Sequence, residues 1–363
     1  MKVTFPHLGN AYISIEALLQ GLGHEPITPP FTTKRTLEWG SRISPAETCL
    51  PFKTILGNML EGIELGADSV YMIGGWGPCR LGYYAEIQRI LLADQAKEVE
   101  FITLEVPRDD YSLAWRRLRR IVGPTGVKEL TRGALLSWAK LKAVDEVENL
   151  SLCVRPRERK RGSTSALLQR QLQRFRQAQS MAAIWRIKEE ARTALQDLID
   201  PNATGILRVG LVGEIYVAAE PFVNLRLEER LGYLGVEVLR TIHLHQWVED
   251  HIFKKALGLY KQRSLKRSAA GYLRGFVGGH GLESVARSVD LASKDLAGII
   301  HIFPLSCMPE VIAQGILPQV SEDKKMPIMS LVVDEHGGEI GFQTRLEAFV
   351  DLLQRRVRRY VPS

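Results

Sequence analysis

The first 124 residues alternate short apolar runs with longer amphipathic stretches. We predict strands at the runs Val3–Phe5, Val70–Ile73 and Phe101–Val106, and an extended segment at Glu25–Thr28. Helices are predicted between them, over Ile13–Leu22, from Cys49 to Gly66, after Cys79 and from Asp109 onward. Strands that alternate with helices are typical of a parallel sheet covered on both faces. Residues 1–124 are therefore predicted to form one α/β domain.

The pattern changes between residues 125 and 204. No apolar run there has the length and composition of a strand, and long stretches such as Ser165–Leu198 are rich in Gln, Arg, Ala and Leu. The basic segment Arg155–Gly162 interrupts them and is predicted as a loop. We interpret residues 125–204 as a helical insert or bridge.

A second β-α series begins after residue 205. Its predicted strands are Leu207–Val212, Val236–Leu239, Ile299–Phe303 and Ile328–Val333. Its predicted helices are Pro221–Leu234, most of residues 244–290, a segment after Cys307, and Phe342–Arg359. Residues 205–363 are therefore predicted as a second α/β domain with the same plan as the first.

The composition is that of a globular protein, with 45% hydrophobic and 25% charged residues in a chain of 363. No apolar stretch approaches the roughly 20 residues that cross a bilayer. The segment Met1–Pro6 has the pattern of a strand and lacks the apolar core of a signal peptide. We therefore expect a cytoplasmic protein without a membrane partner, in which cysteines are free, metal-bound or reactive.

The net charge of +7 comes largely from four basic clusters. They are Arg116–Arg120, Arg155–Arg161, Lys261–Arg267 and Arg355–Arg359. Nucleic acid is disfavoured as a partner because only 7% of residues are aromatic and no nucleic-acid motif is present. Solvated helix faces are the preferred interpretation. A docking surface for an acidic partner or a phosphorylated ligand is the alternative.

Three of the four cysteines share one local setting. Cys49 and Cys307 each begin a Cys-x-Pro step, Cys79 directly follows Pro78, and a helical pattern follows all three. Proline is tolerated in the first turn of a helix, so the three thiols are predicted to lie at helix N-termini, where the helix dipole favours a thiolate. Cys79 and Cys307 also follow predicted strands. We expect both at carboxyl ends of strands, facing one cleft, with Cys49 beside Cys79.

Three thiolates in a cleft suit an iron–sulfur cluster. Zinc is the main alternative metal, but a structural zinc site uses four ligands and usually a Cys-x-x-Cys step, which this chain lacks. The wide spacing also matches no compact ferredoxin pattern, so buried structural cysteines remain an alternative. Cys153 lacks the shared setting and is interpreted as structural or free. A cubane with three cysteine ligands would leave one iron open.

Two glycine-rich turns are weaker signals. Val209–Glu214 lacks the Gly-x-Gly-x-x-Gly spacing, and Gly278–Gly281 lies in a predominantly helical region. No Walker A sequence is present, so ATP hydrolysis through a P-loop is not expected. We interpret both turns as tight connections, with close approach to a phosphate or a cluster as the alternative.

The segment Asp334–Glu339 follows the last predicted strand and carries three carboxylates and an imidazole. Glu335, His336 and Glu339 are therefore candidate general acids or bases. The alternative is a helix N-terminus that favours acidic residues. His7, just after the first strand, could face the same cleft, but a surface or capping position is the preferred interpretation.

Several of these segments together resemble a known family. They are Ser44–Lys53 with Gly57 and Gly66–Asp68, Val212–Val217 with Glu220, Pro221 and Asn224, Cys307–Glu310, and Asp334–Phe349. In this order, over most of the chain, they resemble the 2-hydroxyacyl-CoA dehydratase component family, and in particular its branch related to acyl-CoA dehydratase activases.

The resemblance implies two flavodoxin-like domains with helical additions and a 4Fe–4S cluster in the cleft between them. Cys49, Cys79 and Cys307 match the ligand positions. It also implies anaerobic electron transfer from a separate ATP-hydrolysing activase, a CoA thioester as substrate, and pairing into a homodimer or a heterodimer with a related subunit. The best-known members remove water from 2-hydroxyacyl-CoA. The double-cubane subgroup needs more cysteines than this chain has, so one cubane is expected.

Two further functions stay open at this point. The chain could be a non-catalytic iron–sulfur electron relay or regulatory subunit. It could also be a binding module with zinc or no metal, whose thiols are inert. The substrate, the fourth ligand and the oligomeric state do not follow from the sequence.

Overall fold

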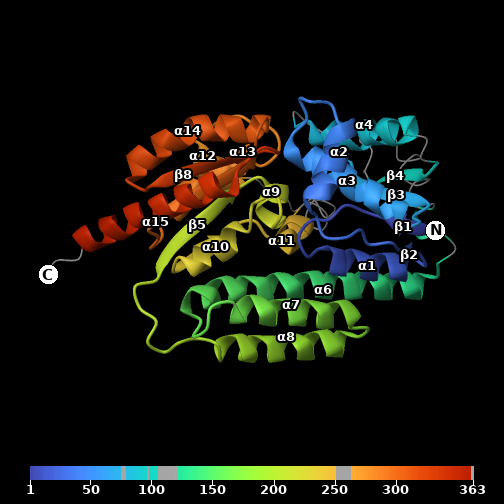
Figure 1. Cartoon of the computed structure of the whole chain (residues 1–363), viewed down its shortest axis with the longest axis horizontal. Coiled ribbons are helices and arrows are strands. Elements are labelled where there is room, and N and C mark those ends of the chain that lie inside the picture. Colours follow the sequence, from blue (N-terminus) through green and yellow to red (C-terminus); the bar gives the residue numbers. More distant parts are fainter. Residues whose placement is uncertain are drawn as a thin grey trace. The chain divides into compact units, whose positions relative to one another are not determined.

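The computed structural model describes residues 1–74, 79–95, 98–104, 119, 121–123, 125–250 and 263–360 (Figure 1). The chain forms two compact units. Unit 1 comprises Met1–Leu141 with Gln179–Met181, and unit 2 comprises Lys142–Ala178 with Ala182–Ser363. The predicted helix from Asp109 lies outside the described residues.

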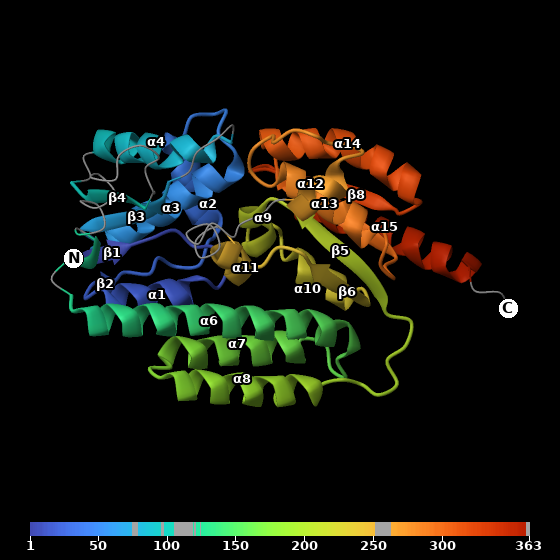
Figure 2. The same ribbon diagram turned by 180° about the vertical axis from the view of Figure 1, so that it is seen from behind.

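Unit 1 contains a parallel sheet of four strands in the order β2-β1-β3-β4. The strands are β1 (Lys2–Thr4), β2 (Glu25–Pro26), β3 (Ser69–Ile73) and β4 (Glu100–Leu104). The helices between them are α1 (Tyr12–Gly21), α2 (Lys34–Ile43), α3 (Leu50–Glu64) and α4 (Leu81–Asp94). Helix α1 covers one face of the sheet, and α3 and α4 cover the other (Figures 1 and 2). The three predicted strands of this sheet are confirmed, and the predicted extended segment contains β2.

Unit 2 repeats this topology with strand order β6-β5-β7-β8, again entirely parallel. The strands are β5 (Leu207–Gly213), β6 (Val236–Arg240), β7 (Gly298–Pro304) and β8 (Ile328–Val333). The helices are α9 (Ile215–Ala219), α10 (Leu227–Tyr233), α11 (Leu244–Val248), α12 (Arg263–Ala269), α13 (Gly281–Leu291), α14 (Met308–Lys324) and α15 (Glu339–Tyr360). Every residue of β7 is buried, as expected for a central strand covered on both faces. Two doubly wound α/β sheets are thus present.

The described residues that follow β4 and precede β5 in the sequence are largely helical. They form α6 (Val127–Val154), a short 3₁₀ turn at Arg155–Arg157, α7 (Ser163–Gln177) and α8 (Met181–Gln196). Helix α6 belongs to unit 1 as far as Leu141 and to unit 2 from Lys142 onward.

Glycine at two positions allows the first half of α6 to lie directly on α1. A Cβ atom on Gly21 would be 2.4 Å from the Cα of Gly133. Beside this contact the hydroxyl of Ser14 donates to the carbonyl oxygen of Ser137 over 2.9 Å. The backbones therefore approach more closely than any larger residue would permit.

Several elements differ from the prediction, and one of them is α9, which was not predicted. The stretch Ser165–Leu198 is two helices, because Ala178 adopts an extended conformation between α7 and α8. Helix α10 begins at Leu227 rather than Pro221. Helix α2 has no counterpart in the prediction. Its fully buried residues are only Thr36 and Gly40, neither of which is a large apolar residue, and a capping box between Thr33 and Thr36 defines its start.

No helix in the described part of the chain is long and apolar enough to span a membrane.

Candidate cysteine sites at the strand ends

Each sheet has one position where the winding direction reverses, between β1 and β3 in unit 1 and between β5 and β7 in unit 2. Ligands of doubly wound sheets bind beyond the carboxyl ends of the strands at this position. Cys79 follows β3, and Cys307 follows β7. The two cysteines therefore occupy equivalent places in two sheets of the same topology.

The structure brings Cys49 and the Cys79 segment together in unit 1. Cys49 is the N-cap of α3, with Pro51 in the first turn as predicted. Its Sγ contacts the hydroxyl of Tyr84 on α4, the helix that begins just after Cys79. The guanidinium of Arg80 donates to the carbonyl oxygen of Glu47 over 2.8 Å. Two contacts thus join the two cysteine-bearing segments, as the prediction that Cys49 lies beside Cys79 requires.

A lysine is buried one turn after Cys49. Lys53 is 4% exposed, and its Nζ donates to the carbonyl oxygen of Ala46 over 3.4 Å. Lys53 thus adds a buried cation near the start of α3, the helix that Cys49 caps. Cys49 and Cys79 are both partly buried, and none of the four cysteines forms a disulfide.

Cys307 lies at the N-terminus of α14 in unit 2. It is the N-cap residue, 8% exposed, with Pro309 in the first turn. The residue before it, Ser306, has a positive φ of 66°, and the Cys307 amide donates to the carbonyl oxygen of Pro304 over 3.1 Å. This tight turn directs the chain from the end of β7 straight into the helix.

A buried acid–base pair lies behind Cys307. Glu310, in the first turn of α14, receives a 2.7 Å hydrogen bond or ion pair from His301 of β7, and both side chains are 0% exposed. The His301 ring stacks on Phe303 with ring centroids 4.6 Å apart. The second carboxyl oxygen of Glu310, Oε1, has no hydrogen-bond partner among the described residues.

A second carboxylate, Glu214, lies at the end of β5. It caps α9 by accepting hydrogen bonds from the amides of Tyr216 at 3.0 Å and Val217 at 2.9 Å. Burial raises the pKa of the Glu214 carboxyl and the charge of Glu310 raises it further, while the two backbone hydrogen bonds and His280 act in the opposite direction. Titratable groups therefore gather at the place where β5 and β7 end.

Glycine is required directly before this carboxylate. Gly213 has a φ of 140°, and a Cβ atom there would lie 1.8 Å from the carbonyl oxygen of Ile302 on the neighbouring strand. The Glu214 amide donates to the same oxygen over 3.0 Å. The Val209–Glu214 turn is thus a tight strand-to-helix connection, as predicted.

The other sequence candidates lie in different surroundings. Glu339 is exposed in the first turn of α15 and forms a 2.8 Å ion pair with Arg230 of α10. His336 is exposed, and its amide donates to Asp334 over 2.9 Å, while Glu335 is partly buried. Glu339 and His336 thus make separate contacts, with Arg230 and with Asp334.

The preferred interpretation of His7 as a surface or capping residue is wrong. His7 is 2% exposed, and its ring stacks on Phe31 and meets Tyr12 edge to face. Its Nε2 forms a 2.7 Å hydrogen bond with the carbonyl oxygen of Pro29. The ring fills the space between the end of β1 and the loop after β2.

Cys153, which the sequence analysis interprets as structural or free, lies near the end of α6. Burial, followed by the charge of Glu237, raises the pKa of its thiol. Arg157 donates to the Cys153 carbonyl oxygen over 2.6 Å and lies 3.6 Å from its Sγ. These surroundings disfavour a thiolate at Cys153.

Exposed apolar side chains lie near both strand-end cysteines in the sequence. Ile73, Leu81 and Tyr83 flank Cys79 in the sequence, and their exposures of 51%, 41% and 68% are high for such residues. Leu305, Met308, Val311 and Ile312 flank Cys307 and are between 37% and 53% exposed. Clustered exposed apolar residues indicate a surface that excludes water when something covers it.

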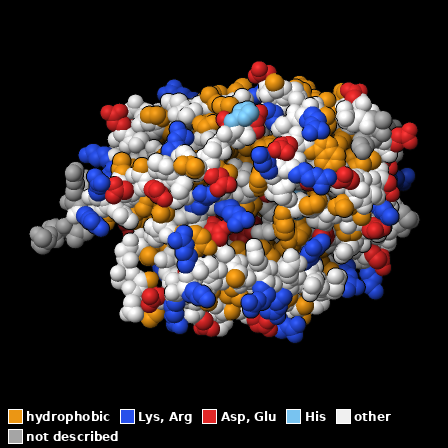
Figure 3. Space-filling view, viewed as in Figure 1, with side chains coloured by type: hydrophobic (Ala, Val, Ile, Leu, Met, Phe, Trp, Pro, Cys, Tyr) orange, Lys and Arg blue, Asp and Glu red, His pale blue; other side chains and the backbone are white. Residues whose placement is uncertain are grey.

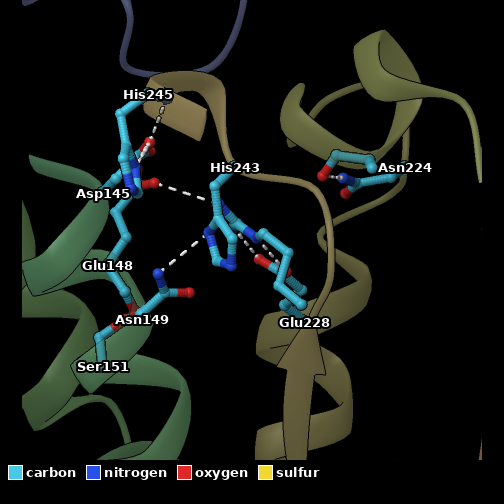
Figure 4. A network of polar contacts seen from close by, with 10 residues as sticks. Asp145, Glu148, Asn149, Ser151, Asn224, Glu228, His243 and His245 are labelled. Atoms are coloured by element: carbon cyan, nitrogen blue, oxygen red, sulfur yellow. Dashed lines mark hydrogen bonds and ion pairs between the residues drawn. The ribbon is translucent and has the colours of Figure 1, made fainter. Parts of the chain in front are cut away.

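Sequence reasoning missed a buried polar network at the end of β6 (Figure 4). The guanidinium of Arg240 donates to both carboxylate oxygens of Glu228, at 2.8 and 2.5 Å, and to Glu148 of α6 at 3.2 Å. Burial lowers the pKa of Arg240, but the surrounding carboxylates more than offset this and raise it overall. The network ties β6 and α10 to α6.

Two histidines extend this network beyond the strand. The side-chain amide of Asn149 forms a 3.1 Å hydrogen bond with Nδ1 of His243, and Asp145 accepts from the amide and ring of His245 at 2.8 Å each (Figure 4). Burial and the charge of Arg240 lower the pKa of His243. The neutral ring can therefore accept from Asn149 and hold the segment after β6 in place.

The basic clusters are not all solvated faces. Arg155 is buried, Arg157 forms a 2.7 Å ion pair with Glu237, and Arg161 lies over the ring of Tyr233. The contacts of Arg157 and Arg161 attach the loop before α7 to β6 and α10 of the same unit. On the face drawn in Figure 3, basic and acidic side chains are interspersed rather than gathered into one basic patch.

Within the residues that the structure describes, no group of three or more His, Cys, Asp and Glu side chains is arranged to hold a metal ion. Unit 1 supplies Cys49 and Cys79, and unit 2 supplies Cys307. No protein-family model matches the chain, and no curated protein matches it.

Proposed function

We propose that Cys49, Cys79 and Cys307 bind one 4Fe–4S cluster in a two-unit enzyme component. The component would accept a low-potential electron from an ATP-hydrolysing activase and pass it to a substrate at the open iron. The observation that carries the proposal is the equivalent placement of Cys79 and Cys307 at the ends of β3 and β7, with Cys49 joined to the Cys79 segment. The resemblance to 2-hydroxyacyl-CoA dehydratase components points to the same three residues.

The donor set fits the chemistry of such a cluster. The two N-cap cysteines begin helices of 15 and 17 residues, and no disulfide occupies any of the three thiols. When bound, a cluster of this kind supplies one-electron chemistry and an open Lewis-acid position. Lys53 offsets negative charge beside Cys49, and the exposed apolar residues around Cys79 and Cys307 reduce the access of water.

The resemblance also suggests the partners. A CoA thioester is the proposed substrate class, and pairing with a second copy or a related subunit is the proposed assembly. Glu214 is a better candidate than Glu335, His336 or Glu339 for proton transfer at this site, because it lies at the strand ends beside β7 and its pKa is raised by burial.

A non-catalytic electron relay is the second candidate, and the exposed apolar side chains around both strand-end cysteines favour it. Surfaces through which proteins exchange electrons are small and transient. In this case the electron would leave to another protein rather than to a substrate.

The first experiment measures iron and acid-labile sulfide in protein produced and purified without oxygen. The variants C49A, C79A and C307A are compared with C153A, a matched control that removes the one cysteine outside the set. We expect wild type and C153A to carry iron and each of the other variants to lose it. Iron-free wild type, or equal loss in C153A, would contradict the proposal.

Electron paramagnetic resonance of the reduced protein then distinguishes the two candidates. An open iron binds added ligands such as cyanide or a thiol, which changes the signal. A spectrum that stays constant with these ligands would favour the relay over the enzyme component.

A further inference from the structure

The first turn of α13 forms a small cleft in unit 2 with the ends of β5 and β6. Its volume is about 10 Å³, so it admits roughly one water-sized group. The residues that matter for binding are Gly213, Thr241, His280, Glu283, Ser284 and Arg287. None of the three proposed cluster ligands lines it.

The backbone at this end of α13 presents unused donors. Gly278 and Gly279 have positive φ values of 86° and 45°, which turn the chain sharply into the helix. His280 is the N-cap residue, but its side chain does not cap the helix. The first helical hydrogen bond runs from the Ser284 amide to the His280 carbonyl oxygen. The amides of residues 281–283 make no hydrogen bond with any described residue.

A buried hydroxyl at the same place also lacks a partner. Ser284 is 2% exposed and lines the cleft, yet its Oγ has no hydrogen-bond partner among the described residues. A buried polar atom without a partner is costly, which indicates that something absent from the protein alone satisfies it. This observation is independent of the helix terminus.

The charged side chains determine which ligand fits. Arg287 lines the cleft one turn further along α13 and offers a guanidinium. Free amides, a hydroxyl and a guanidinium together are the donors that bind phosphoryl groups. Glu283 also lines the cleft, and the negative charge of its carboxylate weakens the binding of an anion there. The wall formed by Thr241 is held by the 2.8 Å hydrogen bond from its hydroxyl to the Leu211 carbonyl oxygen.

We infer that this cleft binds a phosphoryl group, which places one oxygen against residues 281–284 and a second against Arg287. The small volume means that the phosphorus and the rest of the ligand stay at the mouth of the cleft. The site stands apart from the proposed cluster, since it uses no cysteine and can be tested in protein without iron.

The experiment is calorimetric titration of iron-free protein, in a buffer without oxyanions, with inorganic phosphate and separately with glycerol phosphate. Acetate serves as a carboxylate probe. We expect both phosphates to bind more tightly than acetate. Glycerol phosphate binding better than phosphate would identify the site as the phosphoryl end of a larger ligand. The reverse order would identify free phosphate.

Four variants test the assignment. Arg287→Gln should weaken phosphate binding about tenfold or more, and Ser284→Ala about threefold. Glu283→Gln should strengthen it because it removes the opposing charge. Arg274→Gln, at an exposed arginine just before the turn, is the matched control and should leave binding unchanged.

Thermal unfolding shows which variants are folded, and only those are compared. Unchanged phosphate affinity in folded Arg287→Gln would overturn the inference, as would equal loss in the Arg274→Gln control. The iron content of Arg287→Gln is measured separately and should equal that of wild type. Phosphate binding is measured in iron-free protein, so failure of the cluster proposal would leave it unchanged.

Discussion

The pair of His301 and Glu310 allows a quantitative test of how unit 2 is held together. Both side chains are 0% exposed and their atoms Nε2 and Oε2 are 2.7 Å apart, while Oε1 has no partner among the described residues. Removing one member of a buried ion pair costs about 3–5 kcal/mol, because the other charge stays buried alone. Replacing both members with apolar groups of similar volume is close to neutral.

The perturbation is a double-mutant cycle of His301→Phe and Glu310→Met. Phenylalanine preserves the ring that stacks on Phe303. We expect His301→Phe to destabilise unit 2 by about 3–5 kcal/mol, since it leaves a buried carboxylate without a partner. Glu310→Met should cost about 1–3 kcal/mol, since it leaves one ring nitrogen unsatisfied. The double variant should lie within roughly 1 kcal/mol of wild type.

The assay must report on unit 2 alone, because a chain of two units need not unfold in one transition. Hydrogen exchange at increasing urea concentration, followed by mass spectrometry of peptides from β7 and α14, meets this need. Peptides from β3 in unit 1 are the internal control. Simple addition of the two single costs in the double variant would refute the argument that the two groups satisfy each other.

Three shorter predictions follow from single sites. Gly213→Ala should destabilise the protein by about 3 kcal/mol or more in urea denaturation, because a Cβ atom there meets the Ile302 carbonyl oxygen at 1.8 Å and the backbone is strained. Wild-type stability in that variant would contradict the geometry. Burial raises the pKa of Glu214 above its ordinary 4.5, so the stability that its protonated form contributes is present below that value and is lost as pH rises through the folded-state pKa. Relative to wild type, Glu214→Gln should therefore gain stability as the pH rises above about 4.5, and a difference that stays constant with pH would argue against this reasoning. Arg240→Gln should cost about 3–5 kcal/mol by thermal unfolding, since it leaves the Glu228 carboxylate buried without its cation, whereas Arg174→Gln at a more exposed pair should cost less than about 1 kcal/mol.

The sheets were predictable because their strands carry a strong signal. Buried parallel strands are continuous apolar runs, and the runs predicted as strands overlap β1, β3 and β4 in unit 1 and β5–β8 in unit 2. The places of Cys49 and Cys307 at the N-termini of α3 and α14 followed from proline, which marks the first turn of each helix.

Features that depend on contacts distant in sequence were not predictable. Helix α2 packs closely on α3 through Thr36 and Gly40, which are not large apolar residues, so an apolar run does not mark it. Arg155 and Arg240 resemble any other surface arginines until distant carboxylates or helices are placed around them. His7 is buried because Phe31, far along the chain, stacks on it. The pattern of neighbouring residues in the sequence does not show which distant residues will come into contact.

The division of the cysteines between the two units has a consequence for stability. A ligand that binds only the folded state stabilises every unit that contributes to its site. If Cys49, Cys79 and Cys307 hold one cluster, iron loading should slow hydrogen exchange in β3 of unit 1 and in β7 of unit 2 together. In C307A, any iron retained by Cys49 and Cys79 would protect only unit 1. Protection of β3 alone in the loaded wild type would mean that Cys307 is not a ligand, and the equivalence of the two strand ends would then be topological rather than chemical.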